Sequence, residues 1–292
     1  MDAHDKRKGV WPGIGIRQYN VQSGQFAPDI LQTLHASQKN VDNPTPLIPT
    51  QIAQCCTRMR DVGFCFVPAD RAMLEIEPAD WARFAASWND MPEDTYMADG
   101  GHYRRRRHAT LSLAPSDSNA TNATEPTLEA HQPHYQSRDY NNLNGGIARH
   151  FAPIDEAVVQ GTVLKKIFAL CADVFGALSP GRHWHIETHQ FRIEASSGAE
   201  GQPTPEGVHR DGVDYVMVMM VTRHNIREGT TTIHHPDGTE LASFTLIEPR
   251  DMTLVDDHRC LHGVTPVLPI DASRPAWRDV LVVTFREKIP GQ

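Results

Sequence analysis

The sequence lacks features that would direct a protein to a membrane or to an oxidising compartment. No apolar run approaches the roughly 20 residues that a membrane-spanning helix requires. The first residues, MDAHDKRKGVWPG, contain no apolar segment of the kind found in signal peptides. Cysteine is scarce, with 5 residues in 292, and the adjacent Cys55 and Cys56 cannot form an ordinary disulfide with each other. We therefore expect a cytoplasmic, reducing environment and no membrane partner.

Positive charge is in the minority. The chain has 28 Lys and Arg against 36 Asp and Glu, for a net charge of −8. A nucleic-acid-binding surface needs clustered cations that displace counterions, so this balance argues against a nucleic-acid partner. It leaves room for a local basic pocket that binds a small anion. The sequence does not decide between a monomer and a homodimer.

The first part of the chain changes character near residue 50. Residues 1–50 are polar and rich in Pro, Gly, Gln and Asn, which predicts an N-terminal arm or extension. Residues 51–180 contain helix-like periodicity and predict a helical support. Within that region, the Ser-, Asn- and Thr-rich stretch 115–133 predicts a surface insertion. The helices are expected at Gln51–Asp61, from Pro78 onward, and at Ile154–Phe175, with strands at Gly63–Val67 and Ala109–Leu113.

After Pro180 the sequence consists of short β-rich runs separated by turn signals. Many short strands without helices between them favour an antiparallel barrel or jelly roll over a parallel sheet. The predicted fold class is mainly β with flanking helices (α+β). Residues 51–292 are expected to form one domain, with the helical support over 51–180 and the β core over 181–292. The expected strands are 184–194, 213–222, 230–235, 242–247, 252–255 and 279–285.

Two metal-binding side chains stand two residues apart in the segment PEGVHRDG, residues 205–212. In extended chain, His209 and Asp211 point to the same face, so one imidazole and one carboxylate can bind the same cation. His262 is the natural third ligand, because several strands between the two segments can return it to the same rim. Two His and one carboxylate leave three coordination positions open, as in the facial triad of non-haem iron(II) oxygenases. The His-x-Asp pair alone is weak evidence.

One arginine near the end of the chain supports this interpretation. Arg278 opens the run 279–285, and burying it at the inner end of a barrel strand would be costly without an anion. The far carboxylate of a dicarboxylate would form a bidentate pair with the guanidinium. The alternatives are a rim arginine paired to Asp279 or Asp257, and Arg274 as a rival anchor, although Arg274 precedes Pro275 in a loop.

These motifs occur together with others that are typical of one family. Over roughly residues 55–287 the sequence resembles the 2OG-Fe dioxygenase family that includes bacterial L-isoleucine 4-hydroxylase. Fungal relatives that convert valine to an aziridine are also similar. The motifs are HRDGVDY at 209–215, EG at 228–229, EP at 248–249, VDDHR at 255–259, HGVTP at 262–266, RDVL at 278–281, HQFRI at 189–193, QSRDYNNLNGG at 136–146 and GHYRRR at 101–106.

The resemblance implies a double-stranded β-helix core, which is a cupin-like jelly roll. It also implies Fe(II), 2-oxoglutarate and dioxygen, and in many cases a free aliphatic amino acid as the small-molecule substrate. His209, Asp211 and His262 match the iron ligands, and Arg278 matches the position expected for the 2-oxoglutarate anchor. The first 50 residues and the stretch 115–133 depart from the compact bacterial pattern, which leaves the substrate lid undefined.

Strand alternation suggests further residues for the pocket. We place Gln190 and Arg192 inward, where an amide could bind the co-substrate and a cation could bind the substrate. The opposite alternation, with His189 and Phe191 inward, stays open. Alternate members of the run 104–107 share a face, and Arg106 is the candidate for a substrate carboxylate.

The strand that carries Arg278 offers an apolar wall. Val282 and Thr284 share parity with Arg278, so all three side chains are expected on one face of the strand. Their small size favours an aliphatic substrate.

Three functions are compatible with these observations. The first is hydroxylation of an unactivated C–H bond in a free aliphatic L-amino acid. The second is oxidative cyclisation, such as aziridine formation from valine in secondary metabolism. The third belongs to another class, a metal-binding cupin without oxygenase activity, which would need no counterpart of Arg278 and could hold tetrahedral zinc.

Overall fold

The computed structural model describes residues 50–288, with gaps at 72–73 and 116–124. Residues 1–49, which contain nearly all of the predicted arm, lie outside the described residues, as do residues 116–124, which are about the first half of the predicted insertion at 115–133. The division into an arm and a single domain stays a prediction.

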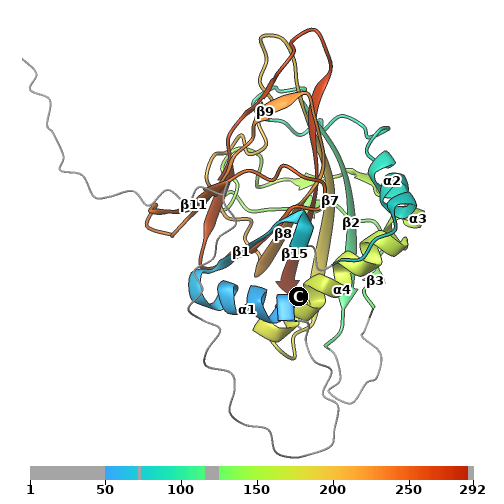
Figure 1. The fold of residues 1–292 in the computed structure, drawn as a ribbon, viewed down its shortest axis with the longest axis vertical. Coiled ribbons are helices and arrows are strands. Elements are labelled where there is room, and N and C mark those ends of the chain that lie inside the picture. The colour runs from blue at the N-terminus through green and yellow to red at the C-terminus, as the bar shows by residue number, and fades with distance from the viewer. Residues whose placement is uncertain (1–49, 72–73, 116–124, 289–292) are drawn as a thin grey trace, which may run out of the picture. The chain divides into compact units, whose positions relative to one another are not determined.

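Eight strands form the main sheet (Figure 1). Their order is β1-β12-β8-β15-β7-β2-β3, and β6 pairs with β2. All these pairs are antiparallel except β2 with β6. The bounds are β1 Phe64–Val67, β2 Arg104–Leu113, β3 Thr127–Leu128, β6 Ala152–Pro153, β7 Trp184–Ala195, β8 Tyr215–His224, β12 Met252–Asp256 and β15 Ala276–Glu287.

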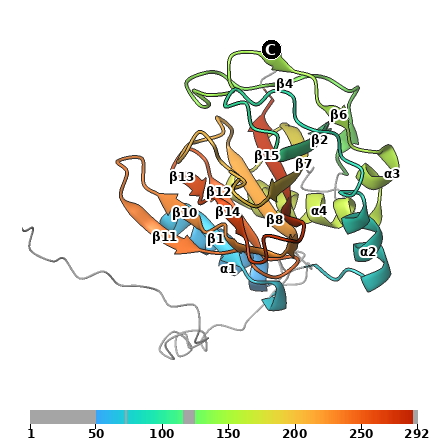
Figure 2. The ribbon, with the colours of Figure 1, turned by 90° about the horizontal axis from the view of Figure 1, so that it is seen from above.

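Smaller sheets complete the β structure. Figure 2 shows β10, β11 and β13 on the side of the main sheet away from α2 and α4. An isolated antiparallel bridge ties His209 to His262 of β13. The bounds are β4 His134–Tyr135, β5 Ala148–Arg149, β9 Ile226–Glu228, β10 Thr231–His234, β11 Glu240–Phe244, β13 Leu261–Val264 and β14 Val267–Pro269. The pairs are β11-β10-β13, β14-β9 and β4-β5.

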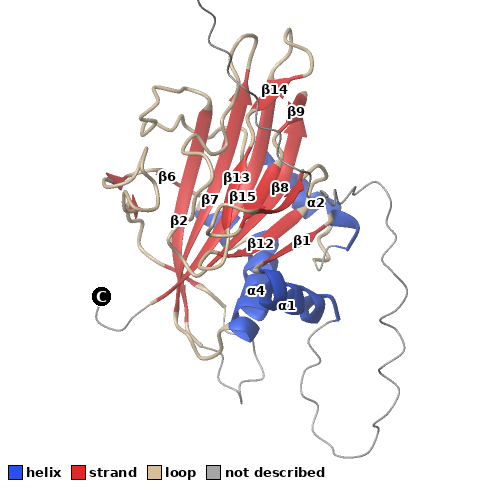
Figure 3. Ribbon diagram, turned by 90° about the vertical axis from the view of Figure 1, so that its left-hand side faces the viewer, coloured by secondary structure: helices blue, strands red, loops and turns tan. Residues whose placement is uncertain are grey.

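The helices gather against one face of the main sheet (Figure 3). They are α1 Thr50–Val62, a 3-10 turn at Ala69–Arg71, α2 Pro78–Ala86, α3 Glu156–Val159 and α4 Thr162–Leu178. The prediction of one continuous helix over Ile154–Phe175 is wrong. Gly161 has an extended backbone with ψ 155° and caps α4, so the helical hydrogen bonds are interrupted between α3 and α4.

The two faces of the main sheet have different chemistry. On β15, Leu281, Val283 and Phe285 join the apolar core beneath the helices. The alternate residues of the same strand, which include Arg278 and Val282, line a pocket on the other face. The sheet therefore separates a stabilising core from a functional cavity.

The predicted fold class is confirmed. The described chain is mainly β with flanking helices, and its antiparallel strands form the double-stranded β-helix (jelly-roll) core. Among the described residues, we find no helix that combines the length and apolar character needed to cross a bilayer.

Phe175 provides a test of the core on the helix side. Its ring is fully buried, stacks on Tyr215 at 4.7 Å and meets Phe285 edge-on at 5.0 Å. We expect Phe175→Ala to lower the free energy of unfolding by about 3–5 kcal/mol, since it removes these contacts and leaves a cavity. Urea unfolding measures the change. The control Ile270→Ala alters a side chain that is 70% exposed and should change stability by less than about 0.5 kcal/mol. Equal effects of the two substitutions would contradict this description of the core.

Candidate active site

The three predicted metal ligands converge. One ligand atom from each of His209, Asp211 and His262 lies within 4.8 Å of the other two. The Nε2 atoms of the two histidines each lie 3.6 Å from an oxygen of the Asp211 carboxylate. The backbones of His209 and His262 exchange two hydrogen bonds of 2.9 Å, so the segment before β8 and strand β13 are fixed side by side.

A buried carboxylate positions the segment that carries the ligands. Asp257 accepts backbone N–H hydrogen bonds from Asp211 at 3.0 Å, Gly212 at 2.8 Å and Val213 at 3.1 Å. Burial, together with the charge of Asp211, raises the pKa of Asp257 to about 6 although these three donors lower it. A cation bound to Asp211 would relieve this repulsion, so the surroundings of Asp211 suit an occupied metal site.

The protonation states of the histidines also suit a metal. The Nδ1 of His209 donates to the carbonyl of Gly207 at 3.0 Å, which leaves Nε2 directed toward Asp211. Burial lowers the pKa of His209, but Asp211 and Glu206 outweigh it and raise the pKa to about 9. Burial and the neighbouring His209 lower the pKa of His262 to about 4. A histidine ligates a metal only through a deprotonated nitrogen, so binding of a divalent cation at Nε2 of His209 would release a proton.

Glu206 is a further acidic residue at the triad, and it was missed in the sequence. Its Oε1 lies 3.5 Å from Nε2 of His209, and its Oε2 is buried without a hydrogen-bond partner among the described residues. The only signal was its position, three residues before His209 in the same segment.

Arg278 is buried and forms no ion pair with any of the described residues. Only 2% of its surface is exposed, and its Nε and Nη2 lack hydrogen-bond partners within the described part of the chain. Both proposed rim partners are engaged elsewhere, because Asp279 pairs with Arg192 and Asp257 binds backbone N–H groups. Burial, then the charge of Arg223, lowers the pKa of Arg278 to about 9. The guanidinium thus has the environment of an anion-binding group. The rival Arg274 is exposed in a loop.

The prediction that Gln190 and Arg192 face inward is wrong. The Nε2 of Gln190 donates to Oγ of Ser87 at 2.7 Å, beyond the end of α2. Arg192 forms a bidentate pair with Asp279 at 2.7 and 2.8 Å. Both side chains share the helix-facing side of β7 with Trp184 and Ile186. The alternate residues of β7, which are His185, Glu187, His189, Phe191 and Ile193, line the pocket.

A second group of arginines lines the pocket. Arg106 is buried between the rings of Phe151 and Phe191, with its guanidinium carbon 4.0 and 4.5 Å from the ring centres. Its Nη2 donates to Nδ1 of His189 at 3.0 Å, and its Nε has no hydrogen-bond partner among the described residues. Arg104, which is paired with Asp94 at 2.7 Å, and Arg149 line the same pocket.

Small side chains of β15 and β8 form another part of the pocket lining. Val282 and Thr284 line the pocket together with Val280 of the same strand, and Val216 and Val218 of β8 extend this lining. The prediction that Val282 and Thr284 lie on the same face of β15 as Arg278 is thus confirmed. Which substrate these residues contact stays a prediction.

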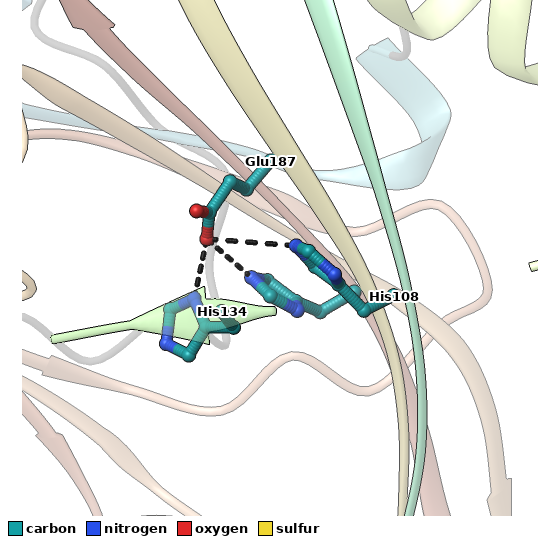
Figure 4. Close-up of side chains that lie close together, drawn as sticks. His108, His134 and Glu187 are labelled. Carbon is teal, nitrogen blue, oxygen red and sulfur yellow. Dashed lines mark hydrogen bonds and ion pairs between the residues drawn. The ribbon is translucent and has the colours of Figure 1, made fainter. Parts of the chain in front are cut away.

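A cluster outside the triad was not anticipated. It consists of His108 on β2, His134 on β4, and Glu187 and His189 on β7 (Figure 4). The Glu187 Oε2 lies 2.5 Å from Nδ1 of His134, 3.4 Å from Nε2 of His189 and 3.7 Å from Nε2 of His108. These residues come from three segments that only the fold brings together, so no local motif could have revealed them.

The jelly-roll fold and the two-histidine, one-carboxylate triad are the arrangement found in non-haem iron oxygenases. Residues 85–284 match the family model described as 2OG-Fe dioxygenase, and the chain belongs to this family.

Relatives agree with this membership. The chain is 28% identical to 3(1)-hydroxy-L-isoleucine 4-dioxygenase of Pantoea ananatis, over 56% of this chain and 67% of that protein. It is 26% identical to L-isoleucine-4-hydroxylase of Bacillus thuringiensis, over 55% and 68%. The crystal structure of a bsmA homolog from Methylobium petroleophilum PM1 is 33% identical, with a TM-score of 0.72 over 82% of this chain and 96% of that one.

Family membership establishes the cofactors. The enzyme is a dioxygenase that uses Fe(II), 2-oxoglutarate and dioxygen, as the resemblance implied. Membership argues against the alternative of a metal-binding cupin without oxygenase activity.

Asp257 allows a test of how the ligands are positioned. Replacing Asp257 with Asn should lower the affinity for Fe(II) by about 10–100-fold, because a neutral amide is a weaker acceptor for the backbone N–H groups around Asp211. Anaerobic competition with a coloured chelator measures the affinity. The matched control is Asp256→Asn, since the Oδ1 of Asp256 accepts from the backbone of His258 and contacts no ligand residue. An unchanged affinity in Asp257→Asn would rule out this positioning role.

Proposed function

We propose that the enzyme hydroxylates an unactivated C–H bond of a free aliphatic L-amino acid. His209, Asp211 and His262 hold Fe(II), and Arg278 binds the distal carboxylate of 2-oxoglutarate. The observation that carries this proposal is that the pocket containing the triad is lined by buried Arg278 and, separately, by the buried pair Arg106 and Arg149. Two such groups suit two carboxylates, one from the co-substrate and one from the substrate.

The residues of the chain bind and orient both molecules. When bound, the iron and 2-oxoglutarate supply the oxidising power, with succinate and carbon dioxide as by-products. Arg106 and Arg149 offer N–H groups without hydrogen-bond partners among the described residues, and these groups suit the substrate carboxylate. The pocket face of β15, with Val282 and Thr284, holds the aliphatic side chain and keeps water from the metal.

Glu206 completes the recognition of an amino acid. Its Oε1 lies beside His209, and its buried Oε2, which has no hydrogen-bond partner among the described residues, suits a positively charged substrate group close to the metal. A carboxylate for the ammonium group and arginines for the carboxylate would bind the zwitterion at both charges. The two bacterial relatives named above act, by their names, on isoleucine and on hydroxy-isoleucine, which supports a substrate of this class.

Two finer points belong to the same proposal. Oxidative cyclisation would use the same site, and secondary metabolism would be the setting if the product were an aziridine. We also infer a cytoplasmic location, which is supported by five cysteines that are all buried and free of disulfides.

The test is release of succinate by anaerobically purified enzyme supplied with Fe(II), 2-oxoglutarate and then air. A panel of free L-amino acids serves as substrates, with His209→Ala as the inactive control. We expect succinate release to rise with aliphatic members and the product to carry one additional oxygen atom. A product that has lost two hydrogen atoms would indicate oxidative cyclisation in place of hydroxylation. Binding of Fe(II) and 2-oxoglutarate with no response to any amino acid would overturn the substrate class.

Arg278 distinguishes the proposed anchor from a structural arginine. Arg278→Gln should raise the KM for 2-oxoglutarate by about 30-fold or more, since loss of one partner of a buried charge pair costs about 2 kcal/mol or more. Steady-state kinetics with varied 2-oxoglutarate measures the change. The control Arg274→Gln removes an exposed arginine four residues earlier and should leave this KM unchanged. A normal KM in folded Arg278→Gln would exclude Arg278 as the anchor.

A further inference from the structure

The cluster around Glu187 has the spacing of a metal site. In the triad, histidine nitrogens lie 3.6 Å from carboxylate oxygens. In the cluster, Nε2 of His108 and Nε2 of His189 lie 3.7 and 3.4 Å from Oε2 of Glu187. Ligand atoms that lie about 2.0–2.2 Å from a tetrahedral ion are separated by about 3.3–3.6 Å, which is close to the spacing of His108. The Nδ1 of His134 lies 2.5 Å from Oε2 of Glu187, so an ion would replace this direct contact and move the two atoms apart.

His108 is the residue that the described protein atoms leave unexplained. It is fully buried, and neither of its ring nitrogens has a hydrogen-bond partner among the described residues. At 3.7 Å, its Nε2 is too far from Glu187 for a hydrogen bond. A buried nitrogen without a hydrogen-bond partner destabilises the folded state, and a cation between Nε2 and the carboxylate would remove that penalty.

His189 is better suited to support the site than to ligate. Its Nδ1 lies 3.0 Å from Nη2 of Arg106, and a guanidinium can only donate, so Nδ1 accepts. The proton of the neutral ring must therefore be on Nε2, which faces Glu187. His185 approaches the other oxygen of the same carboxylate, with its Nε2 3.3 Å from Oε1. Hydrogen bonds to a ligating carboxylate are typical of metal sites.

We propose that His108, His134 and Glu187 form a second metal site at the wall of the pocket, which His134 and Glu187 line, for a first-row divalent transition metal such as Zn(II). Figure 4 shows the rings of His108 and His134 approaching Glu187 from different directions. Two imidazoles and one carboxylate favour this class over Mg²⁺ or Ca²⁺, which prefer oxygen ligands. This proposal is independent of the amino-acid substrate.

The charges around the cluster indicate which further ligand the ion would bind. Glu187 supplies one negative charge, while Arg106 and Arg149 line the same pocket. A divalent ion with one carboxylate retains positive charge, so its open positions should hold an anion such as hydroxide or a carboxylate. Arg106 and Arg149 would also attract this anion. The bound anion would in turn reduce the repulsion between the two arginines and the metal ion.

Metal stoichiometry tests the proposal without an activity assay. Metal-free protein is saturated with Zn(II), desalted and analysed for metal and protein. We expect two ions per wild-type chain, one after His134→Ala or Glu187→Gln, and one after the double substitution His209→Ala and His262→Ala. In that last variant, Co(II) should give a visible d–d absorption that His134→Ala abolishes.

A matched control separates ligation from general disruption. His131 adjoins His108, but its Nε2 is engaged with the carbonyl of Phe151, so His131→Gln should retain two ions. Circular dichroism and thermal melting identify variants that fail to fold. If Glu187→Gln fails to fold, His134→Ala serves as the second variant, because His134 is only partly buried and lies in the short strand β4. One ion per wild-type chain, or two ions in folded His134→Ala, would overturn the second site. If the wild-type chain held no ion at His209 and His262, the result would instead contradict the proposed iron site.

Discussion

The two-residue period of the long strands β7, β8 and β15 is the constraint on which the rest of the structure depends. One alternate set of side chains is mainly apolar and packs with α1, α2 and α4, with Gln190 and the Arg192–Asp279 pair as its polar members. The other set carries charged and imidazole groups into the pocket. A shift of one residue in the register of β15 would move Arg278 into the apolar core and Leu281 into the cavity. The register therefore determines stability and chemistry together.

The pocket keeps charges that a stable core would avoid. Arg106 and Arg278 are buried with guanidinium N–H groups that have no hydrogen-bond partners in the described chain, and Glu206 contributes an unpartnered carboxylate oxygen. Each such group opposes folding unless a ligand binds it. Their positions within one cavity are consistent with an enzyme that binds a metal and two charged small molecules, with the stability provided by the opposite face of the sheet.

The sequence revealed the parts of the site that depend on local spacing. His209 and Asp211 are two residues apart, and Arg278 begins a strand whose alternation holds along its length. Gln190 and Arg192 were misplaced because both alternate sets of β7 contain large apolar residues, Trp184 and Ile186 on one side and Phe191 and Ile193 on the other. Alternation alone could not choose between them. The cluster around Glu187 depends on the pairing of β7 with β2, which no local pattern contains.

The amide of Gln136 joins two regions that the chain places far apart. Its Nε2 donates to the backbone carbonyl of Asp211 at 3.0 Å, while its Oε1 accepts from Nη2 of Arg149 at 3.4 Å. Arg149 belongs to the cationic group proposed for the substrate, and Asp211 belongs to the group proposed for the metal. The side chain of Gln136 thus forms hydrogen bonds with both groups. These two hydrogen bonds therefore hold the guanidinium of Arg149 and the backbone of Asp211 in a fixed position relative to each other.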